Sequence, residues 1–168
     1  MLIAGLLALP TLSPPITHAA TRRQRAQATY QRAVRLRDEL AASLRADTRL
    51  KAKYEKVIGT FRAVHRLDPS FGRAPVGLDA VGELYTEMGR RFTSEHYHRA
   101  AIRAYEYLMA EYPGAGMSRD ALFAIGEIYL TDLASPEEAE RTFQQVVEKY
   151  PRARQAGAAK QKLKEIES

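Results

Sequence analysis

The segment AIRAYEYLMAEYPGAGMSRDALFAIGEIYL, residues Ala101–Leu130, predicts two helices joined by a turn. In its first half the apolar side chains recur at i, i+4, i+7 and i+8, which is the spacing of one helical face. These side chains are Ala101, Tyr105, Leu108 and Met109. Pro113 then ends the helix, because proline cannot continue it and disfavours helical backbone at the residue before it.

The second half of the segment predicts another helix, beginning at about Ser118, whose hydroxyl is expected to cap the first turn. Its buried face is predicted to carry Leu122, Ile125, Gly126 and Tyr129. A single pair of helices cannot bury both of its apolar faces, so this pair requires neighbours.

Other parts of the chain repeat the same pattern. The heptapeptides DAVGELY (Asp79–Tyr85) and FAIGEIY (Phe123–Tyr129) are near copies that lie 44 residues apart. A forward shift of 38 residues places Phe143 on Tyr105. Self-similarity at a period of about 34 to 47 residues, with two helices in each unit, is typical of an α-solenoid.

These residues resemble the tetratricopeptide repeat (TPR), a pattern of about 34 residues marked by W-x2-L-G-x2-Y, A-x3-F and a final proline. Leu78-x2-Val81-Gly82-x2-Tyr85 and Leu122-x2-Ile125-Gly126-x2-Tyr129 match the first mark, with Leu in place of Trp. Ala101-x3-Tyr105 and Ala139-x3-Phe143 match the second, and Pro69, Pro113 and Pro151 supply the third. The resemblance implies an all-α fold in which about seven helices, as antiparallel pairs, form a short TPR-like right-handed solenoid.

The loops between the marks are longer than in the standard repeat. In this they are similar to bacterial envelope proteins such as the Tol–Pal-associated division coordinator and the TPR lipoprotein of outer-membrane assembly. The segment Lys56–Ile166 bears its closest resemblance to the repeats before the catalytic domain of some N-acetylmuramoyl-L-alanine amidases. The resemblance therefore implies a non-catalytic protein–protein interaction module of the envelope, which scaffolds or targets partners in cell-wall or outer-membrane processes. The alternative is the N-terminal targeting region of such an amidase, whose zinc catalytic domain is absent from this chain.

Residues 1–20 form the first of three predicted parts. The apolar run Leu2–Leu12, followed by Thr17-His18-Ala19-Ala20, is typical of a secretory signal peptide and is too short to span a bilayer. We therefore expect export to the periplasm or cell envelope. No Lys or Arg precedes Arg22, so an apolar N-terminus with another purpose stays open. Because the chain has no cysteine, it is not expected to be a lipoprotein or to contain disulfides or cysteine-ligated metal.

Residues 21–67 form the second part, with a basic N-terminal helix expected over Thr21–Arg45 and the first repeat helix over Arg49–Leu67. They hold 13 Lys or Arg against 4 Asp or Glu. The basic helix is either a solvated cap, whose arginine stems cover apolar surface, or a peripheral contact with an anionic membrane or wall polymer. Nucleic-acid binding is not expected, since no groove-reading motif is present.

Residues 68–168 hold the predicted TPR-like repeats and a C-terminal capping helix. Gly89 is expected to close the helix that begins at Ala74, and Arg90–Tyr97 to form an insertion before the next helix. Further on, Ser135 is expected to open a helix through a capping box with Glu138.

The sequence carries no pattern that predicts catalysis. His96 and His98 stand two residues apart, and on a helix such side chains point about 200° apart and cannot share a metal ion. His65 is isolated in the sequence, and no nucleophile–base pair or phosphate-binding loop appears. We therefore predict no enzymatic activity, no metal and no cofactor for this polypeptide.

The resemblance implies that the first helix of each repeat lines a concave groove that binds peptides or partner proteins. The groove-facing positions would be Asp79, Glu83, Thr86, Asp120, Phe123, Glu127 and Leu130. A ladder of carboxylates with one exposed aromatic predicts a partner segment that bears Lys, Arg or free amines. The competing interpretation is an acidic face that serves only solubility. The repeat aromatics Tyr85, Tyr105, Tyr129 and Phe143 are predicted to be core residues.

Overall fold

The computed structural model describes residues 18–43 and 49–168, and these residues form helices, turns and loops with no strand. The helices are α1 (His18–Ser43), α2 (Leu50–Leu67), α3 (Ala74–Phe92), α4 (Glu95–Glu111), α5 (Gly116–Glu127), α6 (Pro136–Lys149) and α7 (Arg154–Glu167). A π-helical turn, η1 (Ile128–Asp132), continues α5. The predicted all-α class is confirmed. Residues 1–17, which hold the apolar run of the predicted signal peptide, lie outside the described residues.

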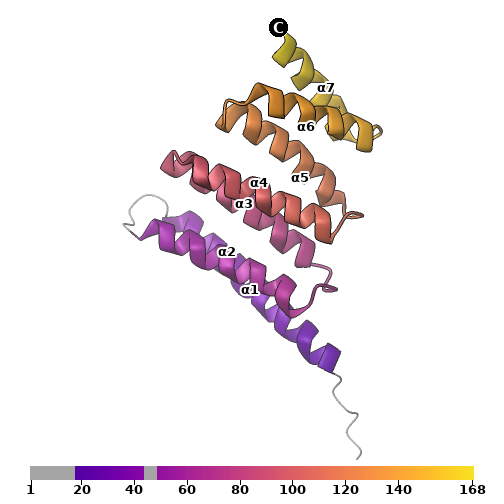
Figure 1. Ribbon diagram of the computed structural model, residues 1–168. Helices are drawn as coiled ribbons and strands as arrows, with labels where there is room; N and C mark the ends of the chain where they lie inside the picture. The colour runs from indigo at the N-terminus through magenta and orange to yellow at the C-terminus, as the bar shows by residue number, and fades with distance from the viewer. Residues whose placement is uncertain (1–17, 44–48) are drawn as a thin grey trace, which may run out of the picture.

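The helices stack in the order of the sequence, from α1 at one end to α7 at the other (Figure 1). Each helix packs against the next along the chain, and in addition α3 touches α5 and α5 touches α7. The odd-numbered helices therefore share one face of the stack, which we call the odd-helix face. Among the described residues no helix is both long and apolar enough to cross a membrane.

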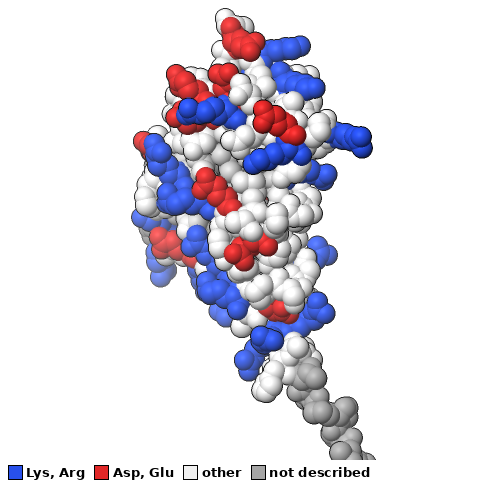
Figure 2. Space-filling view, turned by 45° about the vertical axis from the view of Figure 1, so that its right-hand side comes forward, with Lys and Arg blue, Asp and Glu red and all other residues white. Residues whose placement is uncertain are grey.

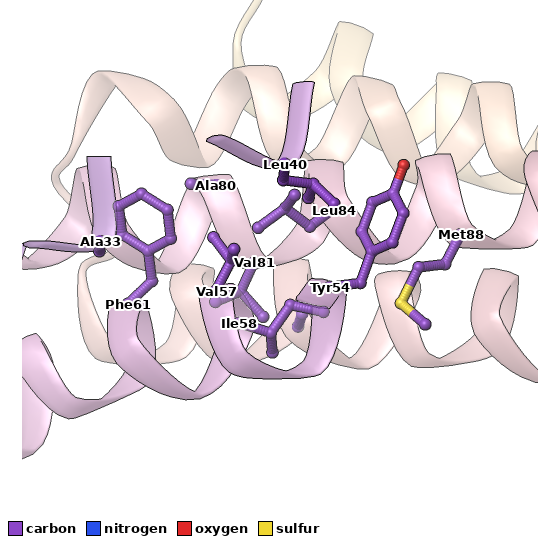
Figure 3. Close-up of a cluster of buried hydrophobic side chains, with 11 residues drawn as sticks. Ala33, Leu40, Tyr54, Val57, Ile58, Phe61, Ala80, Val81, Leu84 and Met88 are labelled. Carbon is purple, nitrogen blue, oxygen red and sulfur yellow. The ribbon is translucent and has the colours of Figure 1, made fainter. Parts of the chain in front are cut away.

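The core is a strip of apolar clusters that lie between successive layers. The cluster of α1, α2 and α3 contains Tyr54, Phe61 and Leu84, each no more than 2% exposed (Figure 3). On α2 the buried apolar side chains recur with the helical period: Tyr54, Val57, Ile58, Phe61 and Val64.

Three glycines of the stack lie against rings from the following helix. A Cβ at Gly82 would stand 2.4 Å from Tyr105, and a Cβ at Gly126 would stand 2.6 Å from Phe143. Each of these two glycines makes room for a ring of the following helix rather than for a second backbone. His98 lies in the same way against Gly89, where a Cβ would meet the imidazole at 2.4 Å.

The predicted insertion Arg90–Tyr97 is wrong, because these residues lengthen two helices. Helix α3 continues past Gly89 to Phe92, and α4 begins at Glu95, so only Thr93 and Ser94 make the turn. The helix end is at Thr93, which adopts the left-handed conformation with φ 47° and donates its N–H to the Gly89 carbonyl. The prediction that Gly89 ends this helix is wrong. Gly89 lies inside α3, where the His98 ring packs against it.

Two predicted serine caps make other hydrogen bonds. Buried Ser118 donates its hydroxyl to the carbonyl of Tyr112 at 2.7 Å, so it fixes the end of the α4–α5 turn instead of capping α5. Ser135 does precede α6, but its hydroxyl donates to the Leu133 carbonyl at 3.2 Å and the capping box with Glu138 does not form.

Replacing Gly82 by Ala should destabilise the protein by about 1–3 kcal/mol, because Tyr105 is buried and its ring is rigid. The matched control is Gly59→Ala in α2, where an added Cβ meets nothing within 4 Å. That change should stabilise by about 0.5–1 kcal/mol through helix propensity. Urea denaturation followed by circular dichroism measures both. Equal midpoints for the two variants would contradict the ring-on-glycine packing.

Candidate functional site

The predicted acidic positions Asp79, Glu83 and Asp120 form one electrostatic group on the odd-helix face. The pKa of Asp79 is raised to about 6, first because burial penalises the carboxylate and then because Glu83 and Asp120 are negatively charged. The Arg37 guanidinium acts in the opposite direction on the same carboxyl. Helices α3 and α5 thus bring together side chains that stand 41 residues apart in the sequence.

Glu83 has a partner from α1. Its carboxylate accepts a hydrogen bond from Arg37 at 2.8 Å, and both side chains are about half exposed, at 48% and 47%. An exposed pair of this kind contributes only about 0–1 kcal/mol to stability, so a competing cation can replace Arg37 at small cost. The predicted carboxylate ladder is therefore partly neutralised by the basic first helix.

Tyr105 connects this acidic group to the core. Its ring is 4% exposed and lies against Gly82, which confirms its prediction as a core residue. Its hydroxyl interacts with Thr86, and its pKa is raised by burial and by the negative charges of Asp79 and Glu83. Thr86 donates its own hydroxyl to the Gly82 carbonyl at 3.0 Å.

The remaining carboxylates of the face also have polar neighbours. Asp120 accepts a hydrogen bond from the Gln155 side chain of α7. Glu127 lies within electrostatic reach of Arg90 on α3 and of Lys162 on α7, and it raises the pKa of each. Arg90 itself binds the nearly buried Asp132 through two hydrogen bonds, at 2.9 and 3.0 Å, and so fastens α3 to η1.

Phe123 and Leu130 belong to the packing of the last layer more than to a binding surface. Both are partly buried against the cluster of α5, α6 and α7, and the Phe123 ring centroid is 5.4 Å from that of Phe143. The prediction that Phe123 is an exposed aromatic is therefore wrong. Phe143 is fully buried as predicted, whereas Tyr85 and Tyr129 are only partly buried.

His65, isolated in the sequence, is buried and is the centre of a hydrogen-bond network. Tyr112 donates its hydroxyl to the Pro69 carbonyl at 2.7 Å, so its oxygen accepts from Nδ1 of His65 at 2.8 Å. Nε2 of His65 forms a hydrogen bond with the Tyr107 hydroxyl at 2.9 Å and lies 3.5 Å from the Glu111 carboxylate. No sequence signal predicts this network, because its members stand 42 and 47 residues from His65.

The two neighbouring histidines of α4 lie in different environments. His98 is 5% exposed and packs on Gly89, whereas His96 is exposed to solvent. Across residues 18–43 and 49–168 no three His, Asp or Glu side chains are arranged to hold a metal ion.

Comparison with protein families finds a repeat within this chain. Residues 120–153 match the tetratricopeptide repeat model, over a segment that begins in α5 and ends after α6. Together with the all-helical stack, the match supports a TPR protein. A search of curated proteins found no significant relative.

Replacing Asp79 by Asn should raise the melting temperature at neutral pH. The folded-state pKa of about 6 lies above the ordinary value of 3.8, so the folded protein binds the extra proton between these values. Its stability therefore falls as the pH rises from 3.8 to about 6, and the loss is complete above that range. The gain from Asp79→Asn should disappear toward pH 3.8. The control is Asp38→Asn on the exposed side of α1. A gain independent of pH would rule out this explanation.

Proposed function

We propose that the odd-helix face binds a cationic segment of a partner protein. The TPR match supports a protein–protein interaction module, and TPR modules act through such helix faces. The observation that carries the proposal is the grouping of Asp79, Glu83 and Asp120 on one face. The pKa of Asp79 is raised to about 6, first by burial and then by the negative charges of Glu83 and Asp120. The nearby positive charge of Arg37 does not fully balance the negative charge of this group, and its carboxylates repel one another at neutral pH.

A Lys or Arg side chain from a partner would relieve this repulsion. It would favour the ionised form of Asp79 and would compete with Arg37 for Glu83. The half-exposed Arg37–Glu83 pair then acts as an internal competitor that a partner displaces. Recognition through exchange of one cation for another should be selective for charge and sensitive to salt.

The cell envelope is the setting that we propose for this interaction. The apolar run Leu2–Leu12 and the resemblance to envelope TPR proteins support export and a scaffolding or targeting role. A basic α1 is compatible with an additional peripheral contact to an anionic membrane or wall polymer. The amidase-targeting alternative remains a prediction, since an interaction module of this kind serves either setting.

Binding of a fluorescein-labelled KYKFKY peptide tests the proposal by fluorescence anisotropy. Glu83→Lys with Glu127→Lys should weaken binding by about tenfold or more, since two attractive charges become repulsive. The control pair Glu148→Lys and Glu167→Lys changes the net charge equally at exposed positions on α6 and α7. Equal losses in both pairs would contradict a local site. Wild-type affinity should also rise with pH through about 6, because a bound cation favours ionised Asp79.

Replacing Arg37 by Ala should strengthen binding of the same peptide by several-fold. The change removes the cation that occupies Glu83, while the folded structure loses only an exposed ion pair. Arg32→Ala, at an exposed position of the same helix, is the matched control and should leave the affinity nearly unchanged. Weaker binding by Arg37→Ala would mean that Arg37 contacts the partner rather than competing with it.

A further inference from the structure

A second, separate binding surface lies between α2 and α4, with α3 as its floor. Here a cleft of about 700 Å³ is open to solvent, a volume in the range of peptide and ligand sites. Helix α3 turns Leu78, Val81 and Tyr85 toward this cleft, whereas its acidic group around Asp79 belongs to the odd-helix face. We call this surface the α2–α4 cleft.

The charged lining of the α2–α4 cleft is mainly basic. Glu55 is the single carboxylate among its described lining residues, against the cations Lys51, Arg62, Arg66 and Arg103. In the part of the chain that the structure describes, neither Arg62, Arg66 nor Arg103 has an ion-pair partner. Several like charges without counter-charges in one concave surface attract an anionic ligand.

Aromatic rings hold two of these cations in place. The Arg62 guanidinium lies 5.4 Å from the ring centroid of Tyr85, and the Lys51 amine lies 5.5 Å from that of Tyr97. The two tyrosine rings are themselves stacked, with centroids 6.4 Å apart. Along the same wall Tyr107 is 46% exposed, while a hydrogen bond between its hydroxyl and His65 fixes the ring. The surface therefore combines positive charge with rings whose positions are set before any ligand binds.

The shape of the cleft favours an extended chain. Its lining follows α2 from Lys51 to Arg66, a distance of about 22 Å at the helical rise of about 1.5 Å per residue. An extended peptide covers about 3.3 Å per residue, so about six or seven residues span this length. Successive side chains of such a peptide point to opposite sides, so one set can face the cations of α2 and α4 while the other faces the tyrosines of α3 and α4.

We propose that the α2–α4 cleft binds an acidic, extended peptide segment with aromatic or apolar residues at alternate positions. The charge of this ligand is opposite to that of the segment proposed for the odd-helix face, so the two surfaces take different partners. A peptide is favoured over a nucleic acid or a membrane, because the cations line a cleft of about 700 Å³. In the view of Figure 2, by contrast, Lys and Arg are interspersed with Asp and Glu and form no continuous basic face.

The test uses a fluorescein-labelled EYEFEY peptide and the neutral QYQFQY peptide with the full chain. The acidic peptide should bind about tenfold or more tightly than the neutral one, and added salt should weaken it. Arg62→Glu with Arg103→Glu should abolish this preference. The control pair Arg152→Glu and Arg154→Glu makes the same change in net charge near the α6–α7 turn and should retain the preference. Arg62→Gln with Arg103→Gln provides a milder second variant if the reversal impairs folding.

The outcomes separate this proposal from that for the odd-helix face. Glu83→Lys with Glu127→Lys should leave EYEFEY binding unchanged, and Arg62→Glu with Arg103→Glu should leave KYKFKY binding unchanged. Equal binding of EYEFEY and QYQFQY would overturn the cleft proposal, whatever KYKFKY does. Binding of a labelled single-stranded oligonucleotide or of anionic vesicles in preference to EYEFEY, with loss in the Arg62–Arg103 variants, would also overturn it, in favour of a polymer or membrane surface.

Discussion

The contact of an aromatic ring with a glycine of the preceding helix is the constraint on which the stack depends. In the α3–α4 layer it occurs twice, as Gly82 with Tyr105 and Gly89 with His98, so both partners are spaced seven residues apart on antiparallel helices. Seven residues are about two turns, which keeps both contacts on one side of each helix. The α5–α6 layer has one such contact, Gly126 with Phe143, and its α-helices are shorter, at 12 and 14 residues. The pair of longer helices, α3 and α4, therefore has two ring–glycine contacts, and the pair of shorter helices, α5 and α6, has one.

Most of the fold was predictable because the residues that pack between helices recur in the sequence at helical spacing. The repeated glycine, aromatic and proline positions located the helices from α3 to α6 and the pairs that pack, whereas α1 carries none of these marks. The error at Arg90–Tyr97 arose because Gly89 has two uses that look alike in a sequence: a helix end and a place for a ring. The difference lies in His98, which is across the turn in α4 and packs its imidazole against Gly89. Ser118 and Ser135 were misassigned for a similar reason, since each hydroxyl found a carbonyl of the preceding turn.

The sequence predicted the acidic positions of the odd-helix face but not their electrostatic state. The repeat placed Asp79 and Asp120 on equivalent helices, and their interaction follows from the packing of α3 on α5. Arg37 was unpredictable as a partner of Glu83, because the first helix carries none of the repeat marks that would fix its register. The α2–α4 cleft was missed for a different reason. Its lining comes from three helices, and the basic residues of any one helix form no pattern that predicts a site. They line one cleft only in the folded stack.

The packing contact and the acidic group are parts of one arrangement, and Tyr105 joins them. Its ring fills the space that Gly82 leaves, while its hydroxyl reaches Thr86 beside the carboxylates of α3. The equivalent residue of the next layer is Phe143, which makes the same ring contact with Gly126 but has no hydroxyl to present. Accordingly the last layer is closed by apolar packing, with Phe123 turned into it. The two repeats therefore differ at two equivalent positions, with Tyr105 against Phe143 and Asp79 against Phe123, and the polar member of each pair belongs to the α3–α4 layer.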